Sequence, residues 1–128
     1  MSRIVLDASA LLALLNGEPG ADKLTPELLN DAVSSTVNLA EVQGKLVHRG
    51  VPSDDAWEAA IAPIREAVPF TAEQAKLAGS PILQTRSLGL SLGDRACLSL
   101  GVLLKAPIYT ADQSWGRLKL GVRIYRIR

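Results

Sequence analysis

Short apolar runs alternate along the chain with longer segments in which apolar residues recur at helical spacing. The apolar runs are predicted strands, at residues 4–6, 32–36, 68–70, 107–110 and 122–127. The helical spacing covers residues 8–15, 37–49 and 54–65, a segment that opens at Thr71, and a segment that runs from Ser91 to about Leu104. This alternation predicts an α/β fold with a mainly parallel sheet, and 128 residues suit one domain, residues 1–128.

Several boundaries are indicated by turn and capping residues. Residues 21–30 are expected to form a short helix that is interrupted where Thr25 caps a turn starting at Pro26. Gly79-Ser80-Pro81 interrupts the helix that opens at Thr71, and residues 113–118 are expected to be a short helical or turn segment.

Two helices have informative faces. Residues 8–15 are apolar almost all round, which is typical of a helix buried in the core or against another chain. In the helix at 37–49, helical spacing divides the residues into an apolar face and a polar face. The apolar face is expected to hold Leu39, Val42, Leu46 and Val47, and the polar face Asn38, Glu41, Lys45 and His48. We interpret His48, the only histidine, as a solvated surface residue.

Composition predicts a soluble cytoplasmic protein with no membrane contact. The single cysteine, Cys97, excludes an internal disulfide. Asp7 interrupts the N-terminal apolar run too early for a signal peptide, and no apolar run is long enough to span a membrane. Although the net charge is only +1, residues 74–128 hold nine bases and two acids. This basic half permits contact with a polyanion, and a solvated edge strand explains the C-terminal cations equally well.

Four acids are expected to meet at one edge of the sheet. Asp7 and Asp112 follow the first and fourth strands, and Glu41 and Asp94 are placed in the first turns of helices that follow the second and third strands. In a parallel sheet with right-handed crossovers, these positions share the carboxyl edge. Each acid also has a local explanation. Asp7 can cap a helix, Glu41 can interact with a helix dipole, and Asp94 can form a capping box with Ser91.

Four clustered carboxylates require neutralisation. Two unit charges ~4 Å apart repel by about 4 kcal/mol at an effective dielectric near 20. A divalent cation is the natural solution, and an all-oxygen donor set selects Mg²⁺ or Mn²⁺ rather than zinc. Such ions activate water and stabilise the leaving oxygen in phosphodiester hydrolysis. The sequence has no phosphate-binding glycine motif and no Ser-His-Asp or Cys-His arrangement.

Four segments together resemble the PIN-domain family, in particular the VapC toxins of VapBC toxin–antitoxin pairs. The segments are LDASAL at 6–11, VNLAEV at 37–42, LSLGDRACL at 90–98 and YTADQSW at 109–115. The resemblance covers essentially the whole chain. It implies a three-layer α/β/α sandwich and endoribonuclease activity that depends on Mg²⁺ or Mn²⁺. It also implies an RNA substrate, a VapB-type antitoxin as partner, and a homodimer.

The resemblance also implies residue roles. Asp7, Glu41, Asp94 and Asp112 match the family's acidic quartet, and Ser9 and Thr110 match polar positions beside it. Asp7 and Asp94 would hold the principal ion, Asp112 and Glu41 would complete the site or orient the water, and Ser9 and Thr110 would fix the carboxylates. RNA would be guided by some of four cations in the basic half, Arg86, Arg95, Arg117 and Lys119.

Three other functions are compatible with parts of this pattern. One is a catalytically idle PIN-like regulator that uses the groove for a protein partner. Another is the same nuclease acting on DNA. The third is a phosphatase of the haloacid-dehalogenase type, which needs a second Asp two residues after the first, where this chain has Ser9.

Overall fold

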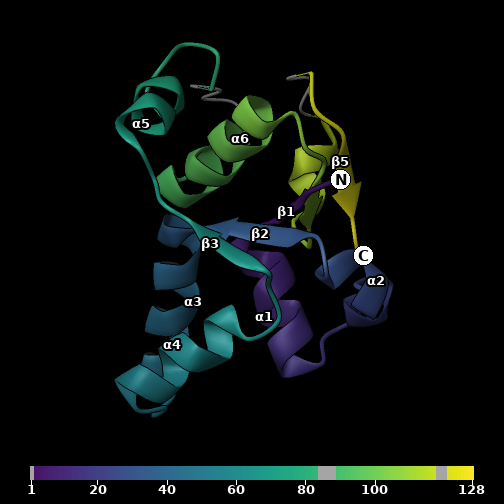
Figure 1. Ribbon diagram of the computed structural model, residues 1–128, viewed down its shortest axis with the longest axis vertical. Coiled ribbons are helices and arrows are strands. Elements are labelled where there is room, and N and C mark those ends of the chain that lie inside the picture. Colours follow the sequence, from purple (N-terminus) through teal and green to yellow (C-terminus); the bar gives the residue numbers. More distant parts are fainter. Residues whose placement is uncertain (1, 84–88, 118–120) are drawn as a thin grey trace.

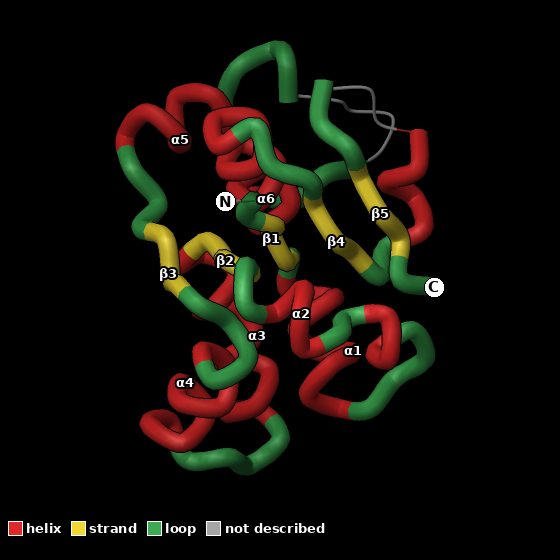
Figure 2. Tube along the Cα trace, turned by 45° about the vertical axis from the view of Figure 1, so that its right-hand side comes forward, coloured by secondary structure: helices red, strands yellow, loops and turns green. Residues whose placement is uncertain are grey.

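The computed structural model describes residues 2–83, 89–117 and 121–128. Its centre is a five-stranded sheet with the strand order β3-β2-β1-β4-β5 (Figures 1 and 2). Every strand pairing is parallel. The strands are β1 (Ile4–Leu6), β2 (Ala32–Ser35), β3 (Glu66–Val68), β4 (Ile108–Thr110) and β5 (Ile124–Arg126).

Helices cover both faces of the sheet, which confirms the predicted α/β/α sandwich (Figures 1 and 2). One face packs against α1 (Ala8–Asn16), α2 (Pro26–Leu29), α3 (Thr36–His48) and α4 (Ser53–Ile61). The other packs against α5 (Ala72–Ala78) and α6 (Leu92–Leu104). Short 3₁₀ turns are η1 (Ala21–Lys23) and η3 (Gln113–Arg117). In the described part of the chain, no helix has the length and apolar character needed to cross a membrane.

Alternation along the buried strands divides the core in two. Leu6 of β1 belongs to the cluster with α1, α3 and α4, whereas its neighbour Val5 belongs to the cluster with α6. Side chains of successive strand residues point to opposite faces, so a strand buried on both faces is apolar throughout. The apolar α1 is explained by this core, because its residues Ala10–Ala13 are buried within the chain itself.

The order of the strands creates a switch point between β1 and β4. The chain builds outward from β1 through β2 to β3 on one side, and then returns to add β4 and β5 on the other. Ligands of open parallel sheets bind outside the carboxyl ends of the strands at such a switch point. Asp7 directly follows β1, and Asp112 lies two residues beyond β4.

Three predicted boundaries were wrong for local reasons. The second strand ends at Ser35, which caps α3 by accepting a hydrogen bond from the Val37 N–H, so Thr36 is helical. The third strand is Glu66–Val68 rather than 68–70, because Pro69 has no N–H to donate and the Phe70 N–H donates to Thr36 Oγ1. The helix predicted at 54–65 ends at Ile61, just before the residue that precedes Pro63.

The faces of α3 also differ from the prediction. Asn38 was placed on the polar face but is buried, and Val47 was placed on the apolar face but is 43% exposed. Because α3 begins at Thr36, Glu41 lies in its second turn rather than its first. Lys45 and His48 are exposed, as expected.

Candidate functional site

A small pocket of about 120 Å³ lies at the carboxyl edge of the sheet, and all four predicted acids line it. Its lining residues are Asp7, Ala8, Ser9, Asn38, Glu41, Lys45, Asp94 and Asp112. The acids come from four separate elements: the ends of β1 and β4, and the helices α3 and α6. The meeting of the acids was therefore correctly expected from the sheet topology, and their chemical roles stay predictions.

Asp7 is the buried member of the group. Only 4% of its surface is exposed, and burial raises the pKa of its carboxyl to about 6, with a smaller contribution from the negative charge of Asp94. Hydrogen bonds from Thr110, the Ala10 N–H and Ser9 oppose the shift in this pKa. An ionised Asp7 is therefore costly in this pocket, and a cation beside it would lower that cost.

Two hydroxyl groups orient the Asp7 carboxylate. Thr110 donates to Asp7 Oδ2 at 2.5 Å, and the Ser9 hydroxyl lies 2.8 and 2.9 Å from the two carboxylate oxygens. Ser9 Oγ accepts from the Ala111 N–H, and Thr110 Oγ1 accepts from the Asp112 N–H. The two hydroxyls thus connect the end of β1 to the end of β4 and fix both Asp7 and the backbone that carries Asp112.

Each of the three Asp carboxylates also stabilises a local turn. Asp7 Oδ1 accepts from the Ala10 N–H at the start of α1. Asp94 Oδ2 accepts from the Ser91 N–H in a complete capping box. Asp112 Oδ1 accepts from the N–H and the hydroxyl of Ser114. Among the described residues, the second oxygens of Asp94 and Asp112 have no hydrogen-bond partner, so they remain able to bind a ligand.

Glu41 reaches the pocket through a gap left by a glycine. A Cβ built on Gly93 would overlap the Glu41 carboxylate. Asn38 donates from Nδ2 to both Glu41 Oε1 and the Gly93 carbonyl, each at 3.0 Å. Its Oδ1 is buried and has no hydrogen-bond partner in the described part of the protein. Buried polar atoms normally have a hydrogen-bond partner, so this oxygen of Asn38 is suited to accept a hydrogen bond from a ligand in the pocket, such as a metal-bound water.

The donor set of the pocket suits a hard divalent ion. All four acids offer oxygen, burial makes the negative charge of Asp7 costly, and the pocket has room for an ion with some of its water. Within the described residues, however, no three His, Cys, Asp or Glu side chains stand close enough to form a ready-made metal-binding group.

Three residues of the site were not predicted. Asn38 and Lys45 were assigned to the same polar face of the helix as Glu41, and that shared face could have placed them beside it. Gly93 gave no signal beyond its place next to Asp94. Of the cations predicted to guide RNA, Arg95 donates to the Ala78 carbonyl at 2.9 Å and so ties α6 to the end of α5. Arg86, Lys119 and the side chain of Arg117 lie outside the described residues.

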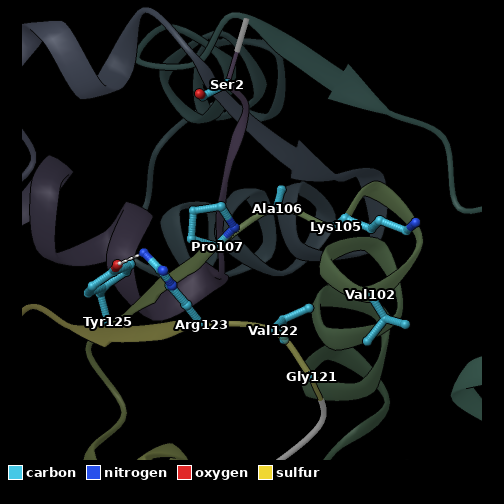
Figure 3. Close-up of a pocket in the computed structure, with 9 residues that line it drawn as sticks. All are labelled: Ser2, Val102, Lys105, Ala106, Pro107, Gly121, Val122, Arg123 and Tyr125. Atoms are coloured by element: carbon cyan, nitrogen blue, oxygen red, sulfur yellow. Dashed lines mark hydrogen bonds between the residues drawn. The ribbon is translucent and has the colours of Figure 1, made fainter.

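A larger hollow lies elsewhere, at the amino ends of β4 and β5 (Figure 3). It measures about 650 Å³, and its lining includes Val102 of α6, Lys105 at the C-cap of that helix, Arg123 and Tyr125. Figure 3 shows the Arg123 side chain turned toward the Tyr125 hydroxyl. No acid is among the described residues that line it. The size of a hollow therefore does not identify the site in this protein. The site is identified by the cluster of acids around Asp7, whose pKa is raised by burial.

Comparison with known proteins identifies the fold and the family. The family model described as PIN domain matches residues 4–120. A chain of DNA-bound VapBC from Salmonella typhimurium has a TM-score of 0.75 and 13% identity over 100% of both chains. A toxin–antitoxin complex from Klebsiella pneumoniae has a TM-score of 0.73 and 13% identity over 98% of both chains.

A third solved structure is named for its reaction. Mycobacterium tuberculosis VapC20, described as a Sarcin-Ricin loop cleaving toxin, has a TM-score of 0.70 and 19% identity, over 91% of this chain and 97% of its own. At these identities the likeness to solved structures concerns the fold. No curated protein matches the sequence.

Proposed function

Because the chain belongs to the PIN-domain family, we propose that it is a metal-dependent endoribonuclease and the toxin of a type II toxin–antitoxin pair. The observation that carries this proposal is the pocket in which Asp7, Glu41, Asp94 and Asp112 meet at the switch point of the sheet. The solved structures support it as well, since they include VapBC complexes and a toxin that cleaves the Sarcin-Ricin loop.

We propose Mg²⁺ as the cofactor, with Mn²⁺ as a substitute. Asp7 and Asp94 would hold the principal ion, and Asp112 and Glu41 would complete the site or orient the attacking water. When bound, the ion supplies a water of lowered pKa and stabilises the charge that develops on the phosphate. Ser9 and Thr110 hold the Asp7 carboxylate in one orientation through their hydrogen bonds, which prepares it for the ion.

The protein partner follows from the same comparison. We propose a VapB-type antitoxin that covers the acidic pocket, because VapBC complexes are among the structures with this fold. A homodimer and a cytoplasmic location belong to the same proposal. An idle regulator would keep the fold without the chemistry, but the complete acidic quartet and the ordered hydroxyls favour an active enzyme.

The direct test is to incubate the purified protein with total RNA in Mg²⁺ or Mn²⁺, with and without EDTA. Cleavage that EDTA abolishes and that Asp94→Asn eliminates supports the proposal. RNA that stays intact with every divalent ion contradicts it, and cleavage of single-stranded DNA instead of RNA would favour the DNA nuclease. In parallel, Mn²⁺ is expected to raise the melting temperature of the wild type and to leave that of the Asp7→Asn, Asp94→Asn double variant unchanged.

A further inference from the structure

A second hollow adjoins the acidic pocket along α3. It measures about 390 Å³ and is lined by Glu41, Gly44, Lys45, His48 and Arg49. Glu41 and Lys45 line both hollows, so the two are neighbours on this helix face. The acidic pocket is therefore bordered by a surface whose charge changes from negative at Glu41 to positive at Lys45, one turn later.

Residue 44, one of those that line this hollow, has no side chain. A Cβ built on Gly44 meets nothing within 4 Å, and its backbone is helical rather than left-handed. Neither packing nor backbone geometry within the described chain requires glycine there. Glycine inside a helix costs about 1 kcal/mol relative to alanine. The presence of glycine at position 44 is explained if another molecule occupies the hollow beside it.

The charges around the hollow identify the chemistry of that molecule. Lys45, His48 and Arg49 are exposed, and none of them takes part in an ion pair among the described residues. Lys45 and His48 lie in the last turn of α3 and Arg49 is its C-cap, so the three cations span little more than one turn, roughly 6 Å along the helix axis. Cations beside an open hollow can bind the backbone phosphates of a nucleic-acid strand whose ribose lies in the hollow. The affinity of proteins for nucleic acids comes largely from such phosphate contacts.

We propose that Gly44, Lys45, His48 and Arg49 form a track that holds the RNA strand next to the phosphate being cleaved. This inference rests on the proposed function and deepens it. The three cations bind backbone phosphate, so the track contributes affinity and register rather than sequence preference. Gly44 keeps the track open. None of these residues contacts the reacting atoms, and they act on the reaction only by positioning the RNA strand.

The test compares Gly44→Glu with Gly44→Gln, which differ in charge but hardly in size. Both replace a helical glycine with a better helix former, so both should melt at or above the wild-type temperature. On a short RNA that the wild type cleaves, we expect Gly44→Glu to raise KM at least tenfold and to change kcat less than twofold. Gly44→Gln should raise KM much less, and His48→Ala with Arg49→Ala should flatten the dependence of KM on salt concentration.

The controls separate this inference from the proposed function. The melting shift caused by Mn²⁺ should be the same in Gly44→Glu and wild type, because the acids are untouched. If wild-type protein cleaves RNA and Gly44→Glu has a KM within twofold of it, the track is disproved while the nuclease stands. Equal losses in Gly44→Glu and Gly44→Gln would also overturn the charge argument. The proposal would also be overturned if Gly44→Glu bound its antitoxin poorly but cleaved RNA normally, because the hollow would then hold the protein partner.

Discussion

Glu41 on α3 occupies the space in which a side chain at Gly93 of α6 would lie. Gly93 has no left-handed backbone that would call for glycine, so the close approach of Glu41 is what requires it. Asn38 completes the contact by donating to both residues. The glycine in front of Asp94 thus acts in the acidic pocket through its missing side chain.

Gly93→Ala is therefore expected to damage the site without damaging the fold. The overlapping atoms belong to the flexible end of Glu41, which can move away at little cost, and alanine favours the helix. We expect a free energy of unfolding within about 1 kcal/mol of wild type, and RNA cleavage reduced to the level of Glu41→Gln. Gly79→Ala, at the end of α5 and outside the acidic pocket, is the matched control. Its new Cβ would meet only the Ala75 carbonyl oxygen, at an ordinary 3.5 Å, so this variant should cleave normally. Full activity in Gly93→Ala would show that the position of Glu41 is unimportant.

The raised pKa of Asp7 makes the stability of the metal-free protein depend on pH. The folded value is about 6 and the ordinary value 3.8, so the folded state binds the proton more tightly. The favourable contribution is complete below pH 3.8 and is lost as the pH rises through 6. At neutral pH the ionised Asp7 costs at most about 3 kcal/mol, since each pKa unit is worth about 1.4 kcal/mol.

Asp7→Asn should consequently stabilise the metal-free protein above pH 7 and lose this advantage near pH 4. Urea unfolding in EDTA across this range measures the difference, with the exposed Asp22→Asn as control. Added Mn²⁺ should reverse the order at pH 7, because only the wild type gains from binding. A constant difference between Asp7→Asn and wild type at every pH would contradict the buried charge.

Much of the fold could be predicted because local and global signals agree. Ser91 and Asp94 form the capping box that their spacing indicates, and the β1 run is buried on both faces as an apolar strand should be. The third strand was misplaced because Val68-Pro69-Phe70 is the more apolar run. In the structure Pro69 has no N–H for the strand ladder, and the Phe70 N–H donates to Thr36 Oγ1 instead.

For the site, topology was enough to bring the acids together but not to choose between their roles. Asp7 was either a helix cap or a pocket acid from sequence, and in the structure one carboxylate does both. Asn38 and Gly93 could not be found in this way, because their importance lies in the contact between α3 and α6, 55 residues apart along the chain. Such a contact produces no pattern of apolar and polar residues in the sequence of either helix.

Thr110→Val tests whether the orientation of Asp7 matters. Valine keeps the size and the branched shape but removes the hydroxyl that donates to Asp7 Oδ2 and accepts from the Asp112 N–H. We expect a loss of about 1–3 kcal/mol in stability from the unpaired buried groups, a pKa of Asp7 above its present value, and slower RNA cleavage. Thr110→Ser retains the hydroxyl and should restore cleavage and the acid limb of the pH–rate profile. If Thr110→Val and Thr110→Ser cleave RNA at the same rate, the hydroxyl has no positioning role.

Gly101→Ala tests the packing of α6 on the sheet, away from the acidic pocket. Its Cβ would lie 2.5 Å from Ile108 Cδ1 and 2.7 Å from Ile108 Cγ1, both buried in the core. Overpacking of this kind costs about 1–3 kcal/mol, which exceeds the gain of about 1 kcal/mol from helix propensity. We therefore expect a net loss of stability in urea unfolding, with RNA cleavage per folded molecule unchanged. Ile108→Val removes Cδ1, so the double variant should be more stable than the sum of the single effects predicts. A Gly101→Ala protein as stable as wild type would mean that α6 and β4 can separate without cost.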